Sequence, residues 1–149
     1  MRHLIFVSLL LGFATLSARG QAEKKAPDPG TGNLFQDLSY KDALAKAKDS
    51  KKVVMVEFAL STCGFCKAMD AKTFPDKQVQ QFIKEKTVPI KVTLDKEKDK
   101  LDKDLRKFIL GAIKTPTIVF VDPDGKELGR TAGFVAAKDF VEKGKGFIK

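Results

Sequence analysis

The sequence predicts an α/β protein with a central mixed sheet of about four or five strands flanked by helices. Short apolar runs rich in β-branched residues, at 53–59, 88–94 and 115–122, alternate with stretches of helical spacing. A tight turn and a second short strand follow the last run, which indicates an antiparallel hairpin. Strands separated by helices are expected to be parallel, through right-handed crossovers.

The first 22 residues are predicted to be a secretory signal peptide. A basic start precedes a 13-residue apolar run, residues 4–16, and small residues follow. This run is shorter than the roughly 20 residues of a membrane-spanning helix. Residues 23–33, rich in proline, glycine and charge, are expected to form a flexible lead, and residues 34–149 one domain. The protein is therefore expected to be periplasmic or secreted after cleavage.

The composition of the exported chain excludes some functions. Arg2 and Arg19 lie in the signal peptide, so 26 of the 28 basic side chains remain against 19 acidic ones, a net charge of +7. The lysines are mixed with acids and form no cluster with aromatic residues, so nucleic acid is not an expected partner. The only histidine is His3, so catalysis through histidine is excluded in the exported chain.

The sequence pattern predicts a helix or a strand for each successive stretch of the domain. A helix over 39–52 begins at Ser39 and Asp42, which have the spacing of a capping box. The nearly all-apolar run 53–59 predicts a strand covered on both faces. The charge-rich stretch 95–109 carries Leu101, Leu105, Phe108 and Ile109 on one stripe, which predicts a solvated helix with one buried face. The other expected elements are helices over 65–74, 75–86 and 136–143, strands over 88–94, 115–122 and 126–133, and a turn at 122–125.

Cys63 and Cys66, in "STCGFCK", are the only cysteines, three positions apart. A structural zinc site needs about four cysteine or histidine ligands, so this chain would need a second molecule to complete one. Covalent haem attachment needs a histidine directly after the second cysteine, where this chain has Lys67. No metal or cofactor is therefore expected.

Two roles remain possible for Cys63 and Cys66: a structural disulfide or a redox centre. A bridge that closes so short a loop constrains the unfolded chain very little. At the start of a helix, free backbone amides stabilise an anion, so the Cys63 thiol is expected to ionise below its ordinary pKa of about 8.5. Cys66, one turn further on, could then attack a mixed disulfide formed by Cys63. The spacing favours thiol–disulfide exchange, with the structural bridge as the alternative.

The strand before this pair, a later Thr115-Pro116 that opens a strand, the hairpin and the last helix together resemble the thioredoxin superfamily. The resemblance covers the chain from about residue 34. Residues 115–140, "TPTIVFVDPDGKELGRTAGFVAAKDF", are most similar to periplasmic thioredoxin-like domains, including the carboxy-terminal domain of DsbD. The resemblance implies a thioredoxin-like fold and a redox-active disulfide between Cys63 and Cys66.

The resemblance also implies roles for individual residues. Cys63 matches the exposed nucleophile and Cys66 the buried resolving thiol. Thr115 and Pro116 match a dipeptide with a cis bond that faces the cysteines and offers main-chain hydrogen bonds to an extended substrate. The alternative for Pro116 is a trans proline at the first position of a strand.

Glu57, six residues before Cys63, matches a buried acid of thioredoxins. Burial raises the pKa of a carboxyl group, which would suit Glu57 to move a proton for Cys66. Lys91 matches a lysine beside this acid. The alternatives are that Glu57 faces solvent on an edge strand and that Lys91 is an ordinary exposed strand lysine.

The dipeptide between the cysteines, Gly64-Phe65, is expected to contact substrate. It departs from the Gly-Pro of thioredoxins, and Thr62 replaces their tryptophan. Because this dipeptide modulates the reduction potential, which ranges from about −270 to −120 mV in the superfamily, the direction of exchange stays open.

These observations predict an exported, monomeric thiol–disulfide oxidoreductase, with a preference for reduction of protein disulfides. Such a reductase would need a membrane electron donor of the DsbD type, because its compartment is oxidising. The alternatives are an oxidase or isomerase with the same chemistry, and a thioredoxin-fold module that binds polypeptides without turnover.

Overall fold

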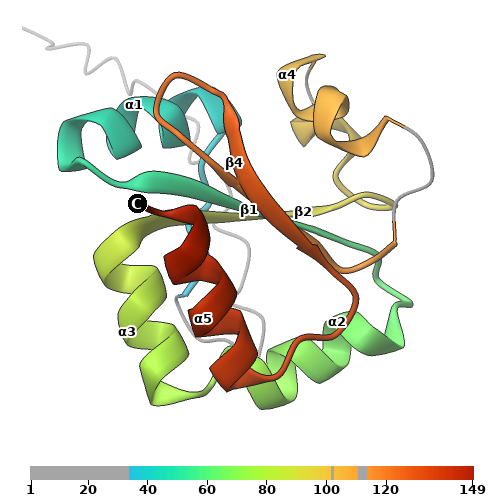
Figure 1. Ribbon diagram of the computed structural model, residues 1–149. Coiled ribbons are helices and arrows are strands. Elements are labelled where there is room, and N and C mark those ends of the chain that lie inside the picture. The colour runs from blue at the N-terminus through green and yellow to red at the C-terminus, as the bar shows by residue number, and fades with distance from the viewer. Residues whose placement is uncertain (1–33, 102, 111–113) are drawn as a thin grey trace, which may run out of the picture.

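The computed structural model describes residues 34–101, 103–110 and 114–149 (Figure 1). The predicted signal peptide, residues 1–22, and the predicted flexible lead, residues 23–33, lie outside these ranges and stay predictions. None of the helices within the described ranges has the length and apolar character needed to span a membrane.

A four-stranded mixed sheet lies at the centre of the described chain. Its strands are β1 (Val53–Ala59), β2 (Thr87–Thr93), β3 (Thr117–Val121) and β4 (Glu127–Ala132). They lie in the order β2-β1-β3-β4, with β2 parallel to β1, β3 antiparallel to β1, and β4 antiparallel to β3. All seven residues of β1 are buried, as expected for a strand with neighbours on both sides and helices over both faces. The predicted α/β class is confirmed.

Helices formed by amphipathic segments cover the sheet. The long ones are α1 (Tyr40–Ser50), α3 (Lys77–Lys86) and α5 (Ala137–Phe147), while α2 (Gly64–Ala68) continues into a π-helical turn, η1 (Met69–Thr73). Ser39 caps α1 as expected, since the backbone N–H of Asp42 donates to Ser39 Oγ at 3.1 Å. Ser39 Oγ in turn donates to Asp42 Oδ2 at 2.6 Å.

Two predictions for the region between β2 and β3 are wrong. The expected helix over 95–109 is instead a series of short turns: η2 (Lys98–Lys100), α4 (Lys103–Arg106) and η3 (Lys107–Ile109). The expected parallel direction holds for β1 and β2 but not for β3, which pairs with β1 so that Phe58 lies opposite Thr117. The physical reason is that these short turns do not carry the chain back along the sheet, so β3 begins at the end where β2 finishes.

Two hydrophobic cores lie on the two faces of the sheet. Side chains alternate along β1, so its odd-numbered residues contact the core under α3 and α5, and its even-numbered residues contact the core under α1 and α4. In Figure 1, α3 and α5 lie side by side across one face, with α2 near one end of the sheet. Phe74, Phe82, Phe120 and Phe140 pack against one another in the first core. Glu57, which is also odd-numbered, places a buried carboxyl group on the side of the sheet that carries this core.

Candidate functional site

Cys63 and Cys66 form a disulfide at the junction of β1 and α2, with their Cα atoms 5.3 Å apart. Cys63 is the residue that caps α2: its backbone is extended, and its Sγ accepts a hydrogen bond from the backbone N–H of Cys66 at 3.1 Å. The backbone N–H of Cys63 donates to the carbonyl of Leu60 at 3.1 Å. The Cys66 amide has no acceptor within the helix and points at the Cys63 sulfur instead, an arrangement that stabilises a thiolate.

The two sulfurs differ in accessibility. Cys63 is partly exposed, whereas Cys66 is only 3% exposed. Between them Gly64 is exposed and has open space around its Cα, and Phe65 is 63% exposed. An incoming sulfur can therefore reach Cys63 and not Cys66, and Phe65 offers an apolar surface beside it.

Thr115, which Pro116 follows, lies against Cys63 of this disulfide, although the two residues are 52 positions apart in sequence. The Thr115-Pro116 peptide bond is cis, and the carbonyl oxygen of Thr115 lies 3.4 Å from Cys63 Sγ. In the disulfide form that sulfur has no hydrogen, so the distance is a contact; a Cys63 thiol could donate to the same oxygen. The carbonyl of Pro116 accepts from the backbone N–H of Gly133 at 2.7 Å, which ties this segment to the end of β4.

Glu57 and Lys91 form an ion pair on the face of the sheet that carries the α3 and α5 core. The two residues are neighbours in the parallel register of β1 and β2, with Lys91 Nζ 3.4 Å from Glu57 Oε2. Glu57 is fully buried on a central strand, so the alternative of an exposed edge position is wrong. Burial by itself would lower the pKa of Lys91, but Glu57 and Asp70 outweigh it and raise the pKa above its usual 10.5.

Asp70 is a member of this group that the sequence did not reveal. It lies on η1, and both of its carboxylate oxygens accept from Lys91 Nζ at 2.9 Å. Lys91 Nζ also lies 5.4 Å from the centre of the Phe35 ring, within range of a cation–π interaction. The signal was its position four residues after Cys66, because one helical turn places both side chains on the same face.

Ser61 and Asp95 form a second contact that the sequence did not reveal. The backbone N–H of Ser61 donates to Asp95 Oδ1 at 3.0 Å, and Ser61 Oγ donates to Asp95 Oδ2. These bonds from the Ser61 hydroxyl and amide lower the pKa of Asp95 below its usual 3.8. They tie the loop before Cys63 to the end of β2. No local sequence pattern predicts a contact between residues that are 34 positions apart.

No group of three or more histidine, cysteine or acidic side chains among residues 34–101, 103–110 and 114–149 is arranged to hold a metal ion.

A family model described as a thioredoxin-like domain matches residues 40–147. The chain belongs to this family. The fold agrees: thioredoxin-like solved structures include a thioredoxin from Thermus thermophilus, 26% identical with a TM-score of 0.59, which matches 72% of this chain and 82% of its own.

Within the thioredoxin-like family, this chain is related to DsbD. It is 31% identical over 152 residues to the thiol:disulfide interchange protein DsbD of Pseudoalteromonas atlantica, across 97% of this chain and 25% of the relative. It is 26% identical, with a TM-score of 0.56, to the oxidised C-terminal domain of Neisseria meningitidis DsbD, across 70% of this chain and 89% of that domain. The chain thus spans about a quarter or less of the length of its DsbD relatives.

Proposed function

We propose that this thioredoxin-like protein is an exported thiol–disulfide oxidoreductase that reduces disulfides in other proteins. The observation that carries the proposal is the pairing of a reachable sulfur, Cys63, with a buried one, Cys66, at the start of a helix. A buried acid, Glu57, lies on the face of the sheet whose core includes Met69, the residue that directly follows this helix. A passive bridge would need none of these features.

The reaction has two exchange steps, which begin from the dithiol form. The Cys63 thiolate attacks one sulfur of the substrate disulfide, and the second substrate sulfur leaves as a thiolate. Cys66 then gives its proton to Glu57 and attacks Cys63 Sγ. The Cys63–Cys66 disulfide closes, and the first substrate sulfur leaves. Two electrons have passed to the substrate, whose two thiolates take up protons, and a dithiol donor must reduce the protein again.

Substrate binding is assigned to the segment that contacts Cys63. The backbone at Thr115, beside Pro116, would pair with an extended stretch of substrate. Gly64 leaves room for that stretch to approach, and Phe65 gives it an apolar contact. Such a segment has the position that a substrate cysteine needs if it is to meet Cys63.

The direction of exchange is proposed from the DsbD relationship. Relatives across most of this chain are named thiol:disulfide interchange proteins. In an oxidising compartment a reductase needs a supply of electrons, which we assign to a membrane donor of the DsbD type. A solved structure titled a putative disulphide-isomerase, 27% identical with a TM-score of 0.63, keeps isomerisation as the second candidate.

A trapping experiment tests the proposal. The reduced Cys66→Ala variant, mixed with a small disulfide-containing protein, is expected to accumulate a covalent adduct that dithiothreitol releases. Cys63→Ala is the matched control and is expected to give none, because Cys66 is buried. Both variants should keep the wild-type circular dichroism spectrum. A folded Cys66→Ala variant that forms no adduct would instead favour the binding module without turnover.

A further inference from the structure

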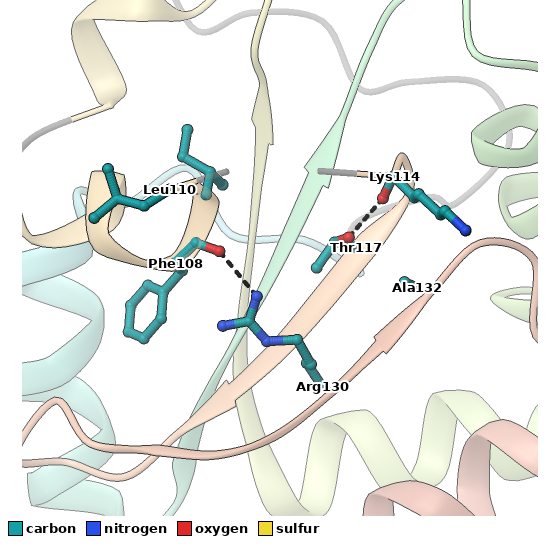
Figure 2. Close-up of a pocket in the computed structure, with 7 residues that line it drawn as sticks. Phe108, Leu110, Lys114, Thr117, Arg130 and Ala132 are labelled. Carbon is teal, nitrogen blue, oxygen red and sulfur yellow. Dashed lines mark hydrogen bonds between the residues drawn. The ribbon is translucent and has the colours of Figure 1, made fainter. Parts of the chain in front are cut away.

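A pocket of about 210 Å³ lies beside the segment that contacts Cys63. Figure 2 shows Phe108 and Leu110 on one side of it, Lys114 and Thr117 on the other, and the Arg130 side chain between them. Ile109 and Ala132 complete the described lining. Residues 111–113, between two of the lining residues, lie outside the described part of the chain.

The place of the pocket links it to substrate binding. Lys114 and Thr117 directly flank Thr115 and Pro116, and Thr117 Oγ1 donates to the carbonyl of Lys114 at 2.5 Å. Thr117 lies on the face of the sheet that carries α1 and α4, because its neighbour Ile118 belongs to the other core. The pocket therefore lies on the α1 and α4 face of the sheet, and its residue Thr117 is only two residues along the chain from Thr115.

The pocket is smaller than a usual small-molecule site. Sites for small molecules usually enclose roughly 300–1,000 Å³, whereas this space accommodates a side chain or two. An extended chain advances about 3.3 Å per residue. Lys114 and Thr117 stand one and two residues from Thr115 in the chain, so a polypeptide that pairs with Thr115 and presents its cysteine to Cys63 would meet the pocket within about three residues of that cysteine.

The chemistry of the pocket is apolar with a positive rim. Leu110 is 81% exposed, the most exposed large apolar side chain among those described. The Arg130 guanidinium is already engaged, since it donates to the Phe108 carbonyl at 3.0 Å and to the Glu127 carboxylate. Lys114 is exposed and makes no ion pair with a described acid, so its charge is available to a partner.

We propose that this pocket is a specificity subsite that takes an apolar side chain of the substrate protein about three residues from the reacting cysteine, with an acidic side chain next to Lys114. The proposal rests on the proposed function and names the kind of polypeptide that it would prefer. Leu110 supplies the apolar contact and Lys114 selects the charge. Neither residue takes part in the exchange of electrons.

Two synthetic peptides test the subsite, each with one cysteine in a mixed disulfide with thionitrobenzoate. One peptide carries leucine and glutamate three and four residues from the cysteine, and the other carries serine and lysine there. The wild-type dithiol protein should reduce the first with a kcat/KM about tenfold higher. Leu110→Ser should lose most of this preference, and Lys114→Glu should lower it about threefold.

Two controls separate the subsite from the reaction itself. Glutathione disulfide is too small to reach the pocket, so its rate should be the same in wild-type protein and both variants. Lys143→Glu makes the same charge change on the exposed side of α5 and should leave the peptide preference unchanged. Equal rates for the two peptides, with normal glutathione disulfide reduction, would overturn the subsite. No reaction with any of the three disulfides would instead contradict the proposed function.

Discussion

Glu57, Lys91 and Asp70 place three charges where a sheet and a helix normally bury apolar side chains. Their mutual contacts explain why the arrangement is tolerated, since Lys91 Nζ meets both carboxylates and buried charges need such partners. Glu57 could be predicted because it is the one acid within an apolar strand, and Lys91 because it matches a lysine beside this acid in thioredoxins. The spacing of Asp70 from Cys66 did not identify Lys91 as its partner, because that contact depends on which face of η1 meets β2.

The first prediction concerns the proton acceptor. We expect Glu57→Gln to slow the attack of Cys66 on the mixed disulfide about 100-fold at pH 7, because the buried thiol loses the group that takes its proton. Stopped-flow release of the second product thiol measures this step. Asp70→Asn also removes a carboxylate from Lys91 and should have a smaller effect. An unchanged rate for Glu57→Gln would remove Glu57 from the mechanism.

The second prediction concerns Asp95, which we infer positions the loop before Cys63. Asp95→Ala should lower the rate at which Cys63 reacts with iodoacetamide at pH 7 several-fold, whereas Asp95→Asn should keep most of it, because an amide oxygen still accepts from Ser61. Asp76→Ala is the matched control: Asp76 accepts from the backbone N–H groups of Gln78 and Val79. Equal effects of all three substitutions would contradict the positioning role.

The pH dependence of this contact follows from the lowered pKa of Asp95. A depressed carboxyl pKa means that the contact is fully present above the ordinary value of 3.8 and is lost as the pH falls through the lower folded value. The pH profile of Cys63 alkylation between 5 and 9 should therefore keep its shape in Asp95→Asn. A change of shape in that range would indicate an electrostatic role for Asp95 instead.

At the scale of the elements, the direction of β3 determines whether Thr115 and Pro116 lie near the cysteines. Because β3 is antiparallel to β1, Thr117 lies opposite Phe58 at the end of β1 that leads to Cys63. A parallel β3 of five residues would start about 16 Å away, at the other end of the sheet. Hydrophobic periodicity locates strands but carries no information on their direction. The thioredoxin resemblance did, since it placed Thr115 and Pro116 opposite the cysteines.

The third prediction concerns the contact between α3 and α5. A Cβ at Gly144 would overlap the buried ring of Phe82, whereas a Cβ at Gly146 would meet no atom within 4 Å. Gly144→Ala should therefore lower the free energy of unfolding by about 1–3 kcal/mol. Gly146→Ala should raise it by about 0.5–1 kcal/mol, because alanine is the better helix former. Urea unfolding measures both, and equal signs would contradict this packing.

At the scale of the whole molecule, the fold gathers distant segments at one end of the sheet. The end of β1, the start of α2, the segment before β3 and the end of β4 all meet around Cys63. The four strands, the cysteine pair and the order of the elements outside residues 95–109 were predictable, because they follow local patterns. Ser61, Asp95 and the pocket at Leu110 were not, because they arise only when these segments come together.

The reduction potential of the Cys63–Cys66 pair tests the central claim most directly. Equilibration with glutathione and dithiothreitol buffers, followed by thiol alkylation and mass measurement, gives the value without tryptophan, which this chain lacks. A reductase should have a potential near the −270 mV or so of thioredoxin. A potential near about −120 mV would make the protein an oxidant, and a disulfide that equilibrates with neither buffer would contradict a redox function.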